Sequence, residues 1–203
     1  MKSLRFACTR CGNCCTDKNT IVNVTYLDIL RIKNGLNLNL SEILEILGFY
    51  VFDKRVTNDD KKKMIISPIM TEKGLAFVGL LKNSLGGCYF YESGKKKCLI
   101  YDLRPMFCRT FPFSFGLLDE KENKTYSEID VFYTEKGKQY CPGITGEAPL
   151  IDLEYWIKLG REALEDLKKD YKMIAEWNKA VKNGSKIPNV KNYLQTIFKL
   201  NKF

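Results

Sequence analysis

Eight cysteines constrain this chain more than any other feature of its sequence. They are Cys8, Cys11, Cys14, Cys15, Cys88, Cys98, Cys108 and Cys141. The first four lie in one short segment, and gaps of two residues between cysteines allow a tight loop to direct several thiolates at one point, as in zinc and iron–sulfur sites. We therefore predict that these cysteines are metal ligands.

Histidine is absent from the sequence. This excludes mixed cysteine–histidine zinc sites, Rieske-type centres, and hydrolytic pairs of serine or cysteine with histidine. Protein ligation of a metal must then come from thiolates, with carboxylates as the only substitute.

Length and composition predict one domain with a real core, because the chain has 203 residues and is 45% apolar. We expect residues 1–150 to form a cysteine-rich metal- or iron–sulfur-binding core and residues 151–203 to form C-terminal helices packed on the same domain. In a reducing compartment, clustered cysteines are ligands more often than disulfides. No signal peptide and no membrane-spanning apolar run is seen, so the expected location is cytoplasmic, without contact with a membrane.

The net charge of +9 is Lys-rich and spread along the chain. Two metal sites with four thiolates each would reduce it to about +5, because each site would carry a net charge of roughly −2. Without a concentrated basic stripe, nucleic acid is an unlikely partner. A protein substrate or a redox partner is the expected partner, and the oligomeric state is left open.

The N-terminal half predicts a strand over residues 20–24 and then a helical pair that covers a sheet. Thr25 caps a helix that begins at Tyr26 and ends at Gly35, and a second helix begins behind Ser41 and ends at Gly48. Charged residues 58–63 predict a turn.

Most other segments predict strands. These are residues 64–70 and 75–81, two short hairpin arms over 88–91 and 97–101, and residues 111–118 and 126–133 on either side of a polar turn. Pro105 marks the start of a short helix with Cys108 in its first turns. A long amphipathic helix is expected from 152 to 182, and a final helix over 190–200 is expected to pack back onto the domain. The fold class is therefore α+β: a small, mostly antiparallel sheet with cysteine-rich metal-binding loops, an N-terminal helical pair and long C-terminal helices.

The order CxxCxxCC, then C-x9-C-L-I-Y-x-x-R-P-x-x-C-R-x-F-P, then a late CPG resembles the YkgJ-type CxxCxxCC family, whose members are usually described as zinc- or iron-chelating proteins. The resemblance covers about residues 6 to 144. Besides the cysteines it includes Tyr101, Arg104, Pro105, Arg109 and Pro112. The family includes flagellin lysine N-methylases, for which an iron–sulfur cluster is implied.

The spacing also bears on which metal is bound. Cys8, Cys11 and Cys14 reproduce the C-x2-C-x2-C run of bacterial ferredoxins. In those proteins a remote cysteine followed by proline completes the set, and here Cys141 is followed by Pro142. This favours a 4Fe-4S cluster, one or two in number. Two zinc sites of four cysteines each explain the same count.

Two questions about the ligands stay open. Adjacent residues usually point their side chains apart, so Cys14 and Cys15 are expected to serve different positions, or one of them is not a ligand. A second site formed by Cys15, Cys88, Cys98 and Cys108 is one solution.

Tyr101, Arg104 and Arg109 are candidate cofactor-binding residues. The two arginines lie on either side of Cys108 in the sequence and could offset the charge of a cluster, while Tyr101 could shield it from solvent. The alternatives are surface arginines paired with acids and an aromatic ring that only packs.

The function that we expect is that of an iron–sulfur protein in redox chemistry or in support of protein modification such as lysine methylation. The alternatives are a non-catalytic zinc scaffold for protein or nucleic-acid interaction, and iron or cluster delivery. The fingerprints of radical S-adenosylmethionine enzymes, Rossmann domains and P-loops are missing from the sequence, so whether the protein is an enzyme stays open.

Overall fold

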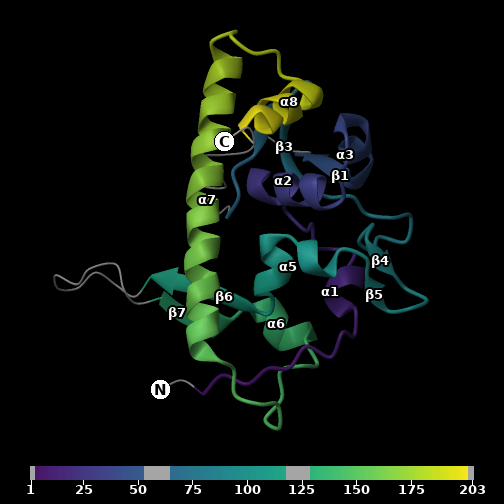
Figure 1. The fold of residues 1–203 in the computed structure, drawn as a ribbon, viewed down its shortest axis with the longest axis vertical. Coiled ribbons are helices and arrows are strands. Elements are labelled where there is room, and N and C mark those ends of the chain that lie inside the picture. Colours follow the sequence, from purple (N-terminus) through teal and green to yellow (C-terminus); the bar gives the residue numbers. More distant parts are fainter. Residues whose placement is uncertain (1–2, 53–64, 118–128, 201–203) are drawn as a thin grey trace, which may run out of the picture.

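The computed structural model describes residues 3–52, 65–117 and 129–200, and the following account concerns these residues. The helix α7 (Leu153–Lys182) runs along one side of the molecule (Figure 1). Its N-cap is Asp152, whose carboxylate accepts a hydrogen bond from the backbone N–H of Tyr155 at 3.1 Å. Such a cap satisfies one of the free N–H groups at the start of a helix, and the predicted helix over 152–182 is confirmed.

Two capped helices follow the cysteine-rich N-terminus. In α2 (Tyr26–Gly35) a capping box joins Thr25 and Asp28, as the sequence predicts for its start. In α3 (Leu40–Ile46) the capping box joins Asn39 and Glu42, so this helix begins before Ser41.

The predicted end of the second helix at Gly48 is wrong. From Leu47 the chain runs as the strand β1 (Leu47–Val51), which pairs with β3 (Gly74–Leu80) in antiparallel register from Leu47↔Leu80 to Val51↔Ala76. This long-range pairing overrides the local helical pattern, because Phe49, Tyr50 and Val51 are strand formers that fit a pleated, half-buried surface.

The strands are all antiparallel and are divided among three small sheets. The first has the order β1-β3-β2, with β2 at Ile69–Thr71. The second is the hairpin of β4 (Tyr91–Glu92) and β5 (Lys97–Cys98), and the third joins β6 (Phe113–Leu117) to β7 (Ile129–Tyr133). The α+β fold class is confirmed.

Some strand predictions differ in detail. Residues 20–24 form no strand and contribute only an isolated bridge between Asn23 and Gly79. The predicted turns at 58–63 and 119–124 lie outside the described residues, as do the outer ends of the predicted strands at residues 64, 118 and 126–128.

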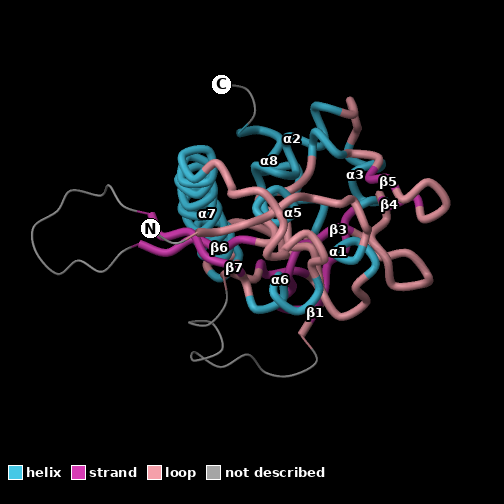
Figure 2. Tube along the Cα trace, turned by 90° about the horizontal axis from the view of Figure 1, so that it is seen from below, coloured by secondary structure: helices cyan, strands magenta, loops and turns pink. Residues whose placement is uncertain are grey.

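Short helices occupy the space between α7 and the β4–β5 hairpin, as Figure 2 shows from below. They are α1 (Asn13–Thr16), the 3-10 helix η1 (Tyr101–Leu103), α5 (Met106–Thr110) and α6 (Glu135–Tyr140). The predicted short helix containing Cys108 is confirmed as α5. No helix is predicted at α6 from the sequence, because its residues EKGKQY have no apolar period.

The core reaches from the C-terminal helix to the cysteine hairpin. In α8 (Val190–Leu200) the side chains of Tyr193, Leu194 and Ile197 are buried, so the prediction that this helix packs back is confirmed. The same cluster of buried residues includes Cys88 and Ile100. A cysteine that is a candidate ligand is therefore anchored in the core.

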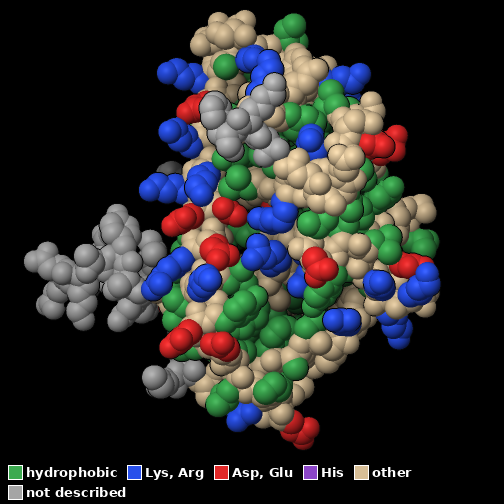
Figure 3. Space-filling model, in the orientation of Figure 1, with side chains coloured by type: hydrophobic (Ala, Val, Ile, Leu, Met, Phe, Trp, Pro, Cys, Tyr) green, Lys and Arg blue, Asp and Glu red, His purple; other side chains and the backbone are tan. Residues whose placement is uncertain are grey.

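The visible surface carries charges of both signs. Figure 3 shows Lys and Arg side chains interspersed with Asp and Glu along α7, with no separate basic stripe on this face. Among the described residues, no helix combines the length and the apolar composition needed to cross a bilayer.

Candidate metal centre

The segment before Cys8 is bound to the segment that follows Cys141. The backbone N–H of Phe6 donates to Pro149 O at 3.0 Å, and that of Ala7 donates to Gly143 O at 3.1 Å. The ring of Phe6 also packs edge-on against Phe113, with centroids 5.5 Å apart. These contacts hold the two ends of the metal-binding region together.

The loop from Cys11 into α1 depends on an unusual backbone. Arg10 and Gly12 both have positive φ, 53° and 83°. Glycine adopts this left-handed conformation without strain, and here a Cβ at residue 12 would also lie 1.9 Å from Tyr91 Oη. Beyond this turn, the side-chain amide of Asn13 donates to Tyr140 O at 3.0 Å and so places α1 beside Cys141.

These contacts define a first set of thiols, which we call the N-terminal group: Cys8, Cys11, Cys14 and Cys141. Burial raises the pKa of the Cys141 thiol, and negative charge on Cys11, Cys8 and Cys14 raises it further. Cys141 thus interacts electrostatically with the three other members of this group, and Cys14 interacts in the same way with Cys88, Cys98 and Cys108.

A second set, which we call the hairpin group, contains Cys15, Cys88, Cys98 and Cys108. The backbone N–H of Cys88 donates to Cys15 O at 2.7 Å, the N–H of Tyr91 donates to Cys88 O at 3.0 Å, and Tyr91 pairs with Cys98 across β4 and β5. Burial raises the pKa of Cys108 well above its usual value, and the charges of Cys88, Cys14 and Cys98 add to this effect.

Cys14 and Cys15 join the two groups. Their sulfurs lie 3.9 Å apart, so the expectation that these side chains diverge is wrong. A hydrogen bond from the Cys15 thiol lowers the pKa of Cys14 to about 7, while the same bond raises the pKa of Cys15. Cys14 is thus the thiol most easily ionised at neutral pH among those whose pKa is shifted.

The three predicted cofactor-binding residues are placed differently. The guanidinium of Arg104 lies 3.7 Å from the centre of the Tyr101 ring, and its Nε donates to Tyr101 O at 2.8 Å. Burial raises the pKa of Cys98, and the positive charge of Arg104 opposes this increase; at Cys14 the same charge adds to the lowering caused mainly by the Cys15 hydrogen bond. Arg109 instead pairs with Glu162 of α7 at 3.6 Å. The sequence analysis missed Arg10, whose guanidinium lies 5.0 Å from the same Tyr101 ring.

The donor chemistry fits a thiolate-bound metal. All eight cysteines are free thiols, and soft thiolates suit zinc and iron–sulfur clusters. The neighbouring carboxylate of Asp17 is already held by Lys136 at 2.6 Å and by Thr20, and these contacts lower its pKa. As placed, no three Cys, Asp or Glu side chains in the described part of the chain are close enough to hold one metal ion. The backbone brings candidate ligands near one another, and their sulfurs would have to converge further to hold a metal ion.

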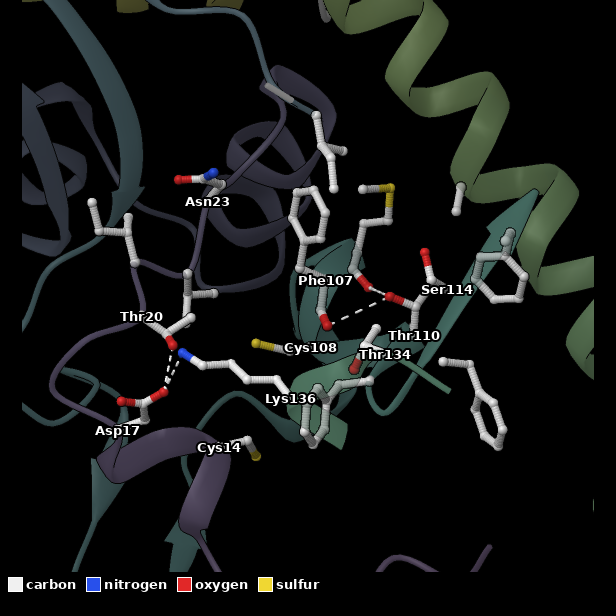
Figure 4. A pocket seen from close by; sticks show the side chains of 18 of the residues that line it. Cys14, Asp17, Thr20, Asn23, Phe107, Cys108, Thr110, Ser114, Thr134 and Lys136 are labelled. Atoms are coloured by element: carbon white, nitrogen blue, oxygen red, sulfur yellow. Dashed lines mark hydrogen bonds and ion pairs between the residues drawn. The ribbon is translucent and has the colours of Figure 1, made fainter. Parts of the chain in front are cut away.

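A cavity of about 410 Å³ lies beside these thiols, between α1, α5, β6 and α7. Cys14 and Cys108 are part of its wall, as are Phe107 and Lys136 (Figure 4). Nothing in the analysis of the sequence indicated this cavity. The only available signal was the run of aromatic residues around Phe111, which reads equally well as a buried strand.

Comparison with known proteins agrees with this chemistry. The family model "CxxCxxCC: Putative zinc- or iron-chelating domain" matches residues 7–142, a range that contains all eight cysteines. The uncharacterized protein MJ0661 of Methanocaldococcus jannaschii is 29% identical over 144 residues, which are 71% of this chain and 60% of the relative. The chain thus matches less than two thirds of that relative's length. No solved structure matches the chain.

Proposed function

Because the chain belongs to the CxxCxxCC family of zinc- or iron-chelating domains, we propose that it binds two metal centres through its eight cysteines. One centre is held by the N-terminal group and the other by the hairpin group. The N-terminal group binds a 4Fe-4S cluster, since its spacing is that of the ferredoxin run completed by a remote Cys-Pro.

One observation supports this proposal: hydrogen bonds bring the segment of Cys8 to that of Cys141, and the segment of Cys15 to that of Cys88, without reference to any metal. The strap of residues 4–7 and the Asn13 amide serve the first set, and the Cys15–Cys88 hydrogen bond with the β4–β5 hairpin serves the second. Four thiolates are a complete ligand set for either zinc or a 4Fe-4S cluster.

The proposed role is redox chemistry, or support for the modification of a protein partner such as lysine methylation. A bound iron–sulfur cluster supplies one-electron transfer at a potential that depends on nearby charge. Within the chain, Arg104 supplies positive charge beside thiols of both groups, and stacking on Tyr101 holds it there. The expected partner is the protein substrate or a redox protein.

A second candidate is a zinc-bound scaffold without redox activity. It is favoured by the hairpin group, because Cys98 lies on a tight two-stranded hairpin and Cys88 lies just before it, as in zinc-ribbon sites. In that case the metal would only stabilise the fold.

Anaerobic purification followed by analysis of metal, acid-labile sulfide and visible absorption separates the two candidates. We expect iron, sulfide and the broad absorption of cysteine-bound clusters. Zinc alone, without sulfide and without visible colour, would overturn the iron–sulfur assignment. The zinc-bound scaffold would then be the remaining candidate function.

The partition into two groups is tested with pairs of substitutions. Cys8→Ser should remove the metal of one centre, and adding Cys141→Ser should remove no more, because both residues belong to the N-terminal group. Combining Cys8→Ser with Cys98→Ser should remove the metal of both centres. Circular dichroism confirms which variants are folded, and equal metal loss in the two double variants would contradict the partition.

A further inference from the structure

We propose that the cavity between α1, α5, β6 and α7 is a binding site for a neutral, largely apolar small molecule, held against the thiols of Cys14 and Cys108. Its volume of about 410 Å³ is in the range of small-molecule sites, which are concave and mostly apolar. That the bound molecule lies beside a metal centre rests on the function proposed above, whereas the binding itself does not.

Aromatic and aliphatic side chains dominate the wall. Phe107 and Phe111 come from α5 and the residue after it, Phe115 comes from β6, and Leu164 and Leu167 come from the facing side of α7. Burial of an apolar ligand surface against such a wall is favourable by about 25 cal/mol per Å².

The charged residues and the threonines in the wall already have partners. The Lys136 ammonium pairs with Asp17 at 2.6 Å, and the Thr20 hydroxyl donates to the same carboxylate (Figure 4). The Thr110 hydroxyl donates to Met106 O at 3.0 Å, and the Thr134 hydroxyl donates to Pro112 O at 3.1 Å. A charged ligand would lose its hydration and find no free counter-charge, so the cavity selects a neutral molecule.

Two wall residues, Asn23 and Ser114, have an unpaired polar group that can orient such a molecule. The side-chain oxygen of Asn23 is buried and accepts no hydrogen bond from the described residues. The Ser114 hydroxyl has no hydrogen-bond partner in the part of the chain that the structure describes, and Figure 4 shows it beside Thr110. The ligand class is therefore an apolar body with one or two neutral hydrogen-bonding groups.

The two thiols in the wall belong to different groups. Cys14 comes from α1 and the N-terminal group, and Cys108 comes from α5 and the hairpin group. Catalytic metal sites differ from structural ones in keeping one side open to a ligand. The cavity wall contains one candidate metal-binding cysteine from each group. A small molecule in the cavity would therefore lie next to the open side of a bound metal.

Binding is tested with N-phenyl-1-naphthylamine, a neutral apolar dye that becomes fluorescent in apolar sites, added to the protein as purified with its metal. Leu164→Trp fills the cavity from α7, and Leu153→Trp makes the same change at an exposed position of the same helix. We expect saturable binding to the wild-type protein, unchanged affinity in Leu153→Trp, and about tenfold weaker binding in Leu164→Trp. The proposal is overturned by non-saturable binding to the wild-type protein, or by equal affinity in two folded variants.

Contact with the metal-binding region is tested by the rate at which the chelator 4-(2-pyridylazo)resorcinol removes metal. Saturating dye should slow this removal at least about threefold in the wild-type protein and in Leu153→Trp, but not in Leu164→Trp, because a bound molecule covers the open side. An unchanged rate with the dye bound would refute the placement beside the metal.

The metal content of the same samples separates the two proposals. If the wild-type protein contains no metal while Leu164→Trp still loses dye binding, the proposed function fails and the cavity site stands. If metal is present and dye binding is the same in both variants, only the cavity site fails.

Discussion

Two buried carboxylates illustrate how differently the same residue type behaves in this fold. Asp28 accepts hydrogen bonds from Thr25, from Arg31 at 2.7 Å and from the Met106 N–H at 3.0 Å, and it links α2 to the start of α5. Asp170 of α7 accepts one bond, from the Tyr26 N–H at 2.8 Å, and is 2% exposed. Burial raises the pKa of Asp170 to about 7, and the charges of Asp28 and Asp166 add to the increase.

A pH dependence of stability follows for Asp170. Because its pKa is higher in the folded than in the unfolded chain, the protonated carboxyl contributes stability that is complete below about pH 4 and is lost as pH rises through about 7. Asp170→Asn should therefore make unfolding less pH-dependent and increase the free energy of unfolding at pH 8 relative to wild type, by at most about 4 kcal/mol. Urea denaturation at pH 5 and pH 8, at equal metal content, measures this.

The control for this prediction is Glu176→Gln, which removes an exposed acid from the same helix. It should keep the wild-type difference between the two pH values. An unchanged pH dependence in Asp170→Asn would show that Asp170 is not the titrating group.

At the scale of elements, the N-terminal strap is bound to the segment before α7, and Cys8 and Cys141 lie next to these two segments in the sequence. The strap has no regular secondary structure beyond the bridge between Arg5 and Leu150, yet it is held by the backbone bonds of Phe6 and Ala7. Tyr133 of β7 adds two contacts to the Arg5 backbone, accepting from its N–H at 2.6 Å and donating to its oxygen at 2.7 Å. The geometry of the N-terminal group thus depends on backbone contact between segments far apart in the sequence.

Gly143 tests this contact, because a Cβ at residue 143 would lie 2.1 Å from Ala7 O. The backbone oxygen of Ala7 cannot move aside as a flexible side chain does, so Gly143→Ala should separate the strap from residue 143. This change should cost about 1–3 kcal/mol of stability and lower the metal content of the N-terminal group. The matched control is Gly146→Ala, whose Cβ meets no atom within 4 Å. Metal analysis and urea denaturation report both effects, and equal behaviour of the two variants would contradict the role of the strap.

At the scale of the whole molecule, the candidate ligands of the hairpin group are continuous with the core, with Cys15 and Cys98 packed against it. Cys88 is part of the core cluster that contains Trp177 and Leu194, and the candidate ligands extend from Cys8 to Cys141. A metal that binds only the folded chain stabilises it by mass action, so loss of metal should weaken the entire domain.

Removal of metal with a chelator should lower the melting temperature by about 10 °C or more, because a loss of about 4 kcal/mol shifts a domain of this size by that amount. Circular dichroism follows the helices, and tryptophan fluorescence follows the core through the buried Trp177. Both signals should shift together. A melting temperature that does not change on complete metal removal would show that the stability of the fold does not depend on the metal.

Local interactions explain what could be predicted from the sequence. The helices α2, α7 and α8 were predicted near their observed bounds because caps such as Thr25 and Asp152, and an apolar face at helical spacing, act within a few residues. The chemistry of the donors was likewise predictable, since eight cysteines without a histidine leave thiolates as the principal ligands.

Tertiary structure decided the rest, because it depends on contacts between distant residues. The segment from Leu47 became a strand only through its pairing with β3, and backbone bonds such as Ala7 to Gly143 bring the segments of Cys8 and Cys141 together. Arg104 and Arg109 look equivalent beside Cys108 in the sequence, yet one stacks on Tyr101 next to the thiols and the other pairs with Glu162. The cysteine pattern determines which chemistry the protein can hold, and only the packing of remote segments decides where it is held and what can approach it.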